Sequence, residues 1–185
     1  MATKSSNGTS FWEGITYDNR PINGWQKLSV DDVYDVKTDA DEKMDWLAGR
    51  ITVSMKCVVD EGDYQGSTAF CSITVGEFTG TRRDGVEYTT TEEQSIKTAG
   101  TRIGRILNLG KHPDLKPELD SDGRDLLNVS RLQTIAESCR GAVFFGNVRS
   151  SGAGTPKVGD GARDIRTSDD IPPELESALP DGFIS

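Results

Sequence analysis

Between Leu47 and Glu77, hydrophobic and polar residues alternate along two stretches that are separated by a polar turn. One face of the first stretch carries Ile51, Val53, Met55, Cys57 and Val59, and one face of the second carries Ala69, Cys71, Ile73 and Val75. Period-two alternation predicts half-buried antiparallel strands. A turn centred on Tyr64 would place Cys57 opposite Cys71, so that every inward residue meets an inward residue. The pattern therefore predicts a central hairpin with one buried face.

The rest of the pattern predicts further strands and two helices around this hairpin. Residues 26–38 mix Val and Tyr with Asp and fit a first strand. Residues 91–110 and 130–141 each begin with a capping box, continue with apolar residues at helical spacing and end at a Gly, which predicts two short helices. Residues 142–149 fit a last strand, and the Asp-Gly pair within 78–88 predicts a tight turn.

The two ends of the chain lack this periodicity. The N-terminal residues contain three large aromatics, Phe11, Trp12 and Tyr17, which precede turn signals at Pro21 and Asn23-Gly24. They favour an arm that packs on the domain or stacks one ring on a ligand. Gly, Ser and charged residues dominate after Ser150, which predicts a flexible tail. We therefore expect an aromatic arm at 1–25, a β-rich domain at 26–150 and a flexible acidic tail at 151–185.

The net charge of −9 argues at first against nucleic acid, but its distribution changes that picture. Residues 1–45 and 153–185 each carry a net charge of −4, whereas residues 46–111 carry 8 basic and 8 acidic groups. A basic face in the middle of the chain is therefore compatible with the composition. The sequence has no apolar stretch of ~20 residues and no signal region. We expect a cytoplasmic protein without a membrane span.

Signals for enzymatic chemistry are weak. The single histidine, His112, lacks a nucleophile elbow or a triad pattern around it. The three cysteines match neither a disulfide framework nor a zinc site. The acidic cluster at 39–45 lacks the spacing of a calcium loop, and the Gly-rich pieces at 152–154 and 159–161 lack the Lys-Ser/Thr pair of a phosphate-binding loop. We expect no catalytic residue, no metal site and no cofactor.

The order of the expected elements, together with three short motifs, resembles a known family. The motifs are V-V-D-E-G-D-Y-Q-G at 58–66, R-I-L-N-L-G at 105–110 and G-A-V-F-F-G-N-V at 141–148. They are similar to the small phage-encoded single-stranded-DNA-binding proteins of replication and recombination cassettes, although the first motif carries an extra acidic residue. The resemblance covers about residues 26–150. It implies a mainly β, OB-like fold, a partly open five-stranded barrel with two short helices.

The resemblance also implies a cationic face for phosphates and aromatic rings for bases. The residues that fit these roles are Arg50, Lys56, Phe70, Arg82, Arg83, Tyr88, Lys97, Arg102 and Arg105. Phe70 is the most informative, because a large aromatic side chain on an otherwise polar face needs a reason. Stacking on bases and packing under a second core both stay open for Phe70. The three basic residues of the helix at 91–110 fit a solvated helix face as well as they fit a DNA contact.

A second resemblance lies in the tail. The stretch S-D-D-I-P at 168–172 is similar to the acidic tip through which bacterial single-strand-binding proteins recruit partners, although Pro173 replaces the expected Phe and the motif is internal. It implies that replication or recombination proteins bind Asp169, Asp170, Ile171, Pro172 and Phe183.

Two functions from different classes follow. The first hypothesis is sequence-independent binding of single-stranded DNA in phage replication or recombination, in the host cytoplasm. The alternative is a phage virion or assembly component with a β-rich core and flexible interaction arms. An inhibitor that mimics DNA through its acidic ends is a weaker third hypothesis. A homo-oligomer is compatible with each of them.

Overall fold

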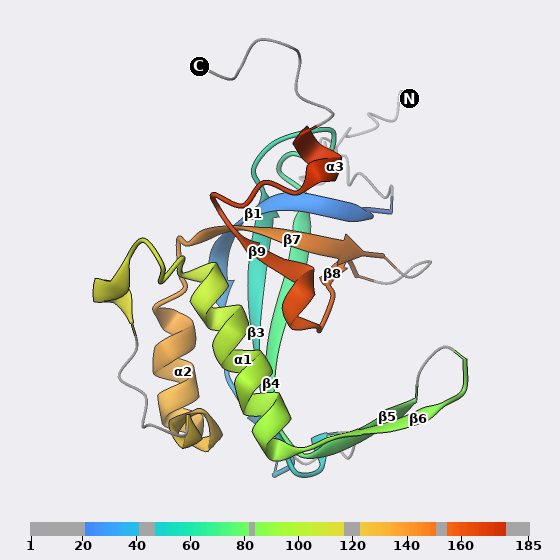
Figure 1. Ribbon diagram of the computed structural model, residues 1–185, viewed down its shortest axis with the longest axis vertical. Coiled ribbons are helices and arrows are strands. Elements are labelled where there is room, and N and C mark those ends of the chain that lie inside the picture. Colours follow the sequence, from blue (N-terminus) through green and yellow to red (C-terminus); the bar gives the residue numbers. More distant parts are fainter. Residues whose placement is uncertain (1–20, 41–46, 82–83, 117–122, 151–154, 177–185) are drawn as a thin grey trace, which may run out of the picture.

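The computed structural model describes residues 21–40, 47–81, 84–116, 123–150 and 155–176. Its centre is a β-barrel closed by five strands (Figure 1). These are β1 (Gly24–Val33), β3 (Arg50–Val59), β4 (Thr68–Gly76), β7 (Val143–Arg149) and β8 (Lys157–Val158). The order β1-β3-β4-β8-β7 returns to β1 through the β1–β7 pair, and β4–β8 is the parallel pair of this ring. The predicted OB-like, mainly β fold is confirmed.

Shorter elements surround the barrel. Strand β2 (Lys37–Thr38) pairs with β3, β9 (Ile165–Thr167) pairs with β7, and β5 (Phe78–Thr81) pairs with β6 (Glu87–Thr90) as a separate arm that projects from the barrel (Figure 1). The helices are α1 (Glu92–Ile106), α2 (Val129–Glu137) and α3 (Pro173–Glu176), with 3-10 turns at Pro113–Leu115, Arg124–Leu127 and Ala162–Asp164. None of the described helices is long and apolar enough to cross a bilayer.

The two longer helices form where the capping patterns predicted them. Thr91 begins α1 with the expected capping box, in which its hydroxyl accepts from the backbone N–H of Gln94. Helix α2 begins earlier than predicted, because the side chain of Asn128, and not Ser130, accepts the backbone N–H of Arg131. The apolar sides of the two helices join the buried cluster of the barrel, and α1 contacts β4 while α2 contacts β3.

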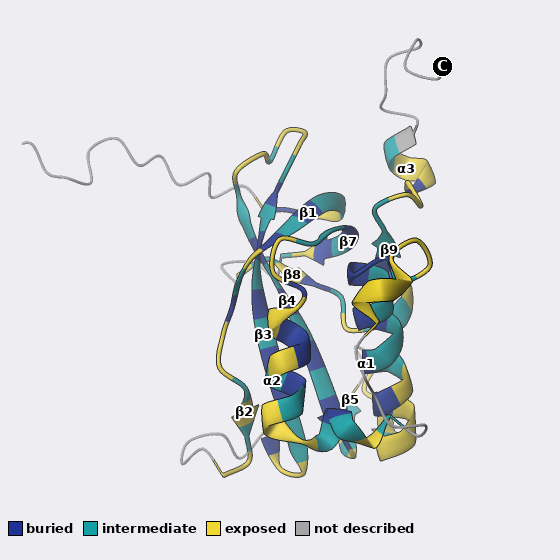
Figure 2. Ribbon diagram, turned by 90° about the vertical axis from the view of Figure 1, so that its left-hand side faces the viewer, coloured by how far each residue is buried: buried dark blue, intermediate teal, exposed yellow. Residues whose placement is uncertain are grey.

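The central hairpin keeps its predicted faces but not its predicted register. Buried and partly exposed residues alternate along β3 and β4 (Figure 2). Met55 pairs with Cys71 and Cys57 pairs with Ala69. The partner of Cys57 is therefore two residues before the predicted partner, Cys71. The turn causes the shift, because Gly66 adopts a positive φ of 80° and donates its N–H to the carbonyl of Val59. A shift of two residues leaves every side chain on its face, so the core prediction survives.

The predicted flexible tail is wrong for residues 155–176, which belong to the folded domain. Strand β8 closes the barrel between β4 and β7, and Val158 and Ile165 are buried. Strands β8 and β9, which carry these two residues, are only two and three residues long. They are too short to show hydrophobic periodicity in the sequence. The boundary at residue 25 is also displaced, since Ile22 is buried and β1 begins at Gly24. Phe11, Trp12, Tyr17 and Phe183 lie outside the described residues.

Candidate nucleic-acid interface

The outward face of β3 and β4 is a row of small hydroxyl side chains with larger groups at both ends. In the middle, Thr52 lies opposite Thr74 and Ser54 lies opposite Ser72, and the paired hydroxyl oxygens are 2.9 and 3.3 Å apart. At the end near the 60–67 turn, Lys56 lies opposite Phe70, and at the other end Arg50 lies opposite Gly76. The sequence therefore places short polar side chains between two ends that carry cations.

Phe70 is partly exposed and forms a ring pair with Tyr34. The two ring centroids are 6.0 Å apart and the planes differ by 19°, which is a stacked arrangement. The backbone N–H of Tyr34 donates to the carbonyl of Ser54 at 2.8 Å, which fixes this loop beside the sheet, and Tyr34 is 41% exposed. Phe70 thus lies outside the buried core and next to a second ring. Sequence reasoning missed Tyr34, although an aromatic among three aspartates was a visible signal.

Cations lie on both sides of Phe70. Lys56 is its neighbour on β3, and Lys157 is its neighbour on β8 through the parallel pair. Arg149 lies opposite Lys157 on β7 and pairs with Asp164 at 2.9 Å. Lys157 is exposed and makes no ion pair with any described carboxylate. The sequence could not show Lys157, because β4 and β8 are about 85 residues apart and their parallel pairing leaves no local pattern.

An acidic residue competes for one of these cations. The Lys56 Nζ atom lies 2.7 Å from an oxygen of Asp31, and this hydrogen bond and charge raise the pKa of Lys56 above its ordinary value. The next carboxylate, Asp32, is bound by Arg140 at 2.7 Å, which lowers the pKa of Asp32. Lys56 is therefore charged at neutral pH, but a phosphate must displace Asp31 to use it fully.

A second group of aromatic and cationic side chains lies at the base of the β5–β6 arm. The guanidinium carbon of Arg50 lies 5.1 Å from the centre of the Phe78 ring, and Tyr88 meets Phe78 edge-on with centroids 6.4 Å apart. Lys37 is exposed and lies opposite Thr52, on the same face of the sheet. The predicted Arg82 and Arg83 fall outside the described residues. The structure thus brings together Arg50 and Tyr88 but leaves the arm's arginines untested.

The helix residues predicted for the interface are corrected. Arg102 is only 2% exposed and donates to the carbonyls of Gly159, Gly161 and Ser72. Arg105 donates to the carbonyls of Ala162 and Ile165 at 2.5 and 2.9 Å. Both are structural, because the chain after residue 155 folds over this side of α1. Lys97 is exposed, but α1 packs against the inner side of the hairpin, away from Phe70.

The acidic motif at 168–172 is bound to its own domain. Asp169 accepts from the side-chain amide of Asn108 and pairs with Lys111 at 3.0 Å, and these contacts lower the pKa of Asp169. Asp170 pairs with Arg166, and Pro172 is buried. The expectation that this motif hangs on a free chain is wrong. Recruitment of a partner through it stays a prediction.

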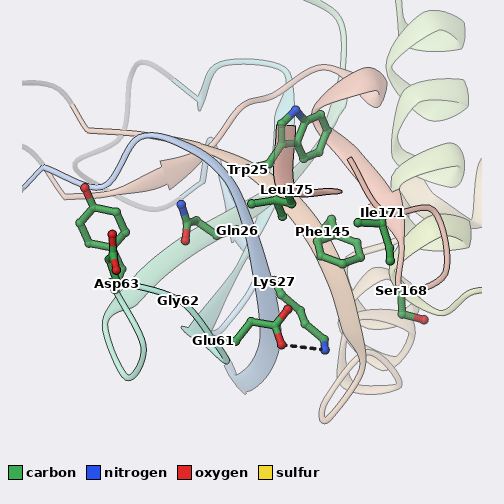
Figure 3. A pocket seen from close by; sticks show the side chains of 11 residues that line it. Trp25, Gln26, Lys27, Glu61, Gly62, Asp63, Phe145, Ser168, Ile171 and Leu175 are labelled. Atoms are coloured by element: carbon green, nitrogen blue, oxygen red, sulfur yellow. Dashed lines mark hydrogen bonds and ion pairs between the residues drawn. The ribbon is translucent and has the colours of Figure 1, made fainter. Parts of the chain in front are cut away.

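The outward face of β1 and β7 is largely covered by the same C-terminal segment. Ile171 and Leu175 line a cavity of about 670 Å³ together with Trp25, Tyr64 and Phe145 (Figure 3). A Lys27–Glu61 ion pair lies at the edge of this cavity. Arg166 lies over the Trp25 ring at 5.2 Å, and Phe145 is only 3% exposed. The C-terminal segment therefore lies on the face of β1 and β7, whereas the Tyr34–Phe70 pair lies on the face of β3 and β4.

The described residues offer little for other chemistry. Burial raises the pKa of Cys57, Cys71 and Cys139, and it brings that of Cys139 to about 12. A thiol with a raised pKa is a poor nucleophile at neutral pH. No described group of three His, Cys, Asp or Glu side chains is arranged to hold a metal ion. Aromatic and cationic contact is the chemistry that this surface presents.

The fold and surface together define an OB-like barrel whose β3 and β4 face carries aromatic rings, cations and hydroxyls. Comparisons with protein-family models, with curated proteins and with solved structures found no match. Function is therefore inferred from the geometry of this chain.

Proposed function

We propose that this protein binds single-stranded DNA without sequence preference, through the outward face of β3 and β4. The observation that carries the proposal is the Tyr34–Phe70 ring pair on a strand face of an OB-like barrel, with Phe70 between Lys56 and Lys157. The strand face of this fold, with its adjoining loops, is a common site for oligonucleotides.

The proposed contacts follow from the chemistry of a single strand. Each base has two π-faces, so an exposed ring can stack on any base, and such stacking is worth ~1–3 kcal/mol per base. Lys56 and Lys157 would neutralise the phosphates on either side of the stacked base. The partly exposed hydroxyls of Ser54, Ser72 and Thr74 would donate to phosphate oxygens, as Ser and Thr do in many complexes.

The same surface favours a single strand over a duplex. Stacking on Phe70 requires an exposed base face, and the bases of a duplex already stack on each other. The net charge of −9 also disfavours a large non-specific duplex footprint. A role in phage replication or recombination is supported by the sequence resemblance at 58–66, 105–110 and 141–148.

The proposal is tested by titrating fluorescent oligo-dT with the full chain at low and moderate salt. We expect binding that weakens with salt, because each neutralised phosphate of a single strand contributes a slope of about −0.7 to log K against log salt. Absence of binding at low salt would refute the proposal.

Two lysine variants provide a matched comparison. Lys157→Ala should weaken binding and make the salt slope shallower by roughly one phosphate. Lys97→Ala removes an exposed lysine from α1 and should leave the affinity and the salt slope unchanged. Equal effects of the two variants would indicate attraction by overall charge and not by this face.

A further inference from the structure

We infer that the base of the β5–β6 arm forms a second stacking subsite for the same DNA strand, made by Phe78, Tyr88 and Arg50. The inference rests on the proposed function. It adds a second point of contact and a minimum strand length.

The ring of Tyr88 is held in place by the arm itself. Tyr88 lies opposite Gly80, and a Cβ atom added at Gly80 would come within 2.7–2.9 Å of the Tyr88 ring. The ring therefore lies across the backbone of β5, and a glycine is required beneath it. Phe78 shares this face of the arm and meets Tyr88 edge-on. Tyr88 is still 38% exposed, so ring surface is available to a base.

Arg50 connects this cluster to the rest of the proposed interface. Its guanidinium lies over Phe78 at 5.1 Å, a distance typical of cation–π contacts. Arg50 also belongs to the outward row of β3 that contains Thr52, Ser54 and Lys56. A phosphate bound at Arg50 would thus lie beside the arm rings and in line with the hydroxyl row.

The spacing of the two subsites predicts the length of DNA that engages both. Six residues separate Arg50 from Lys56 on β3, and a strand advances about 3.3 Å per residue, so the ends are about 20 Å apart. A stacked DNA strand advances about 3.4 Å per nucleotide, so about six nucleotides span this distance. Shorter strands reach one subsite, and longer ones reach both.

The test measures the affinity of oligo-dT between about three and twelve nucleotides at one low salt concentration. For the natural chain we expect a steep rise in affinity as the strand passes about six nucleotides. Tyr88→Ala should weaken binding of the longest oligomer roughly tenfold while leaving the shortest unchanged. Phe70→Ala should weaken binding at every length, because it removes the first subsite.

Three control variants distinguish loss of the Tyr88 ring from a change in the structure of the arm. Tyr88→Phe keeps the ring and should bind long oligomers as the natural chain does. Gly80→Ala displaces the ring without removing it and should resemble Tyr88→Ala. Thr89→Ala changes the opposite face of the arm and should have no effect.

The outcomes distinguish the two proposals. If Tyr88→Ala binds long oligomers normally while Phe70→Ala does not, the second subsite is refuted and the proposed function stands. If Tyr88→Phe is as weak as Tyr88→Ala, stacking on this ring is refuted. If the natural chain binds no oligomer at low salt, the proposed function itself fails.

Discussion

Replacing Arg102 by Met removes the group that ties helix α1 to the segment that closes the barrel. The guanidinium donates from Nη1 to the carbonyls of Gly159 and Gly161 at 2.6 and 2.9 Å, and from Nη2 to that of Ser72 at 3.1 Å. A second Nη2 contact reaches the sulfur of Cys71 at 3.3 Å. The residue is 2% exposed, so water cannot replace these partners.

The size of the effect follows from the hydrogen bonds that are lost. Hydrogen bonds to a charged group contribute ~1.5–3 kcal/mol each, so three carbonyls give at most ~5–9 kcal/mol. Burying the charge offsets part of this, and the Nε atom has no partner among the described residues. Methionine leaves these buried carbonyls without their donor, and an unsatisfied buried polar group costs ~1–3 kcal/mol. We expect Arg102→Met to lower the free energy of unfolding by about 4 kcal/mol.

Urea denaturation measures this loss. With a slope of ~2 kcal/mol/M for a domain of this size, the midpoint should fall by about 2 M. Lys97→Met, an exposed site on the same helix, is the control and should change the free energy by less than ~0.5 kcal/mol. If Arg102→Met unfolded at the same urea midpoint as the natural chain, the hydrogen bonds of Arg102 would not stabilise the attachment of β8.

Three other predictions concern charge, backbone and pH. Asp31→Asn should tighten oligo-dT binding about threefold, because it frees Lys56 from a competing carboxylate, whereas Asp35→Asn, just after the end of β1, should not. Gly76→Ala should destabilise the domain by about 2 kcal/mol, because φ is +116° and the new Cβ would lie 2.1 Å from the carbonyl of Gly49. Gly100→Ala, in open space on α1, should instead stabilise it by about 0.5–1 kcal/mol in urea denaturation. The contacts of Asp169 in the folded protein lower the pKa of its carboxyl group. The ionised carboxylate therefore stabilises the fold above its ordinary pKa, and this stabilisation is lost as the pH falls through the pKa of the folded state. Asp169→Asn should therefore flatten the loss of stability between about pH 5 and pH 2, and an unchanged acid profile would contradict that account.

The sequence predicted what depends on local periodicity and failed where distant segments meet. The alternation at 50–59 and 68–76 was enough to identify the buried face of the hairpin, and the capping box at Thr91 located α1. The register depended on the backbone of Gly66, which no alternation encodes. The burial of Arg102 depended on a segment about 57 residues further along the chain.

The proposed interface was predictable only in part for the same reason. Lys56 and Phe70 lie on the outward face that the alternation defined, and the structure places them there. Tyr34 reaches Phe70 through a backbone hydrogen bond to Ser54, and Lys157 reaches it through a parallel strand pair. Neither contact leaves a pattern within its own stretch of sequence. Site residues supplied by the hairpin were found, and those supplied by distant segments were missed.

The segment 155–176 is part of the proposed DNA-binding site. Its first strand closes the barrel and carries Lys157 to the side of Phe70. Its later residues line a cavity with Trp25 and Phe145, where Phe145 is only 3% exposed, whereas Tyr34 beside β3 is 41% exposed. A chain cut after Ser150 would lose β8 and two of the three carbonyls that Arg102 binds, those of Gly159 and Gly161. Any truncation at the C-terminus must therefore retain the chain through Glu176, because a shorter chain changes the proposed binding face and the fold together.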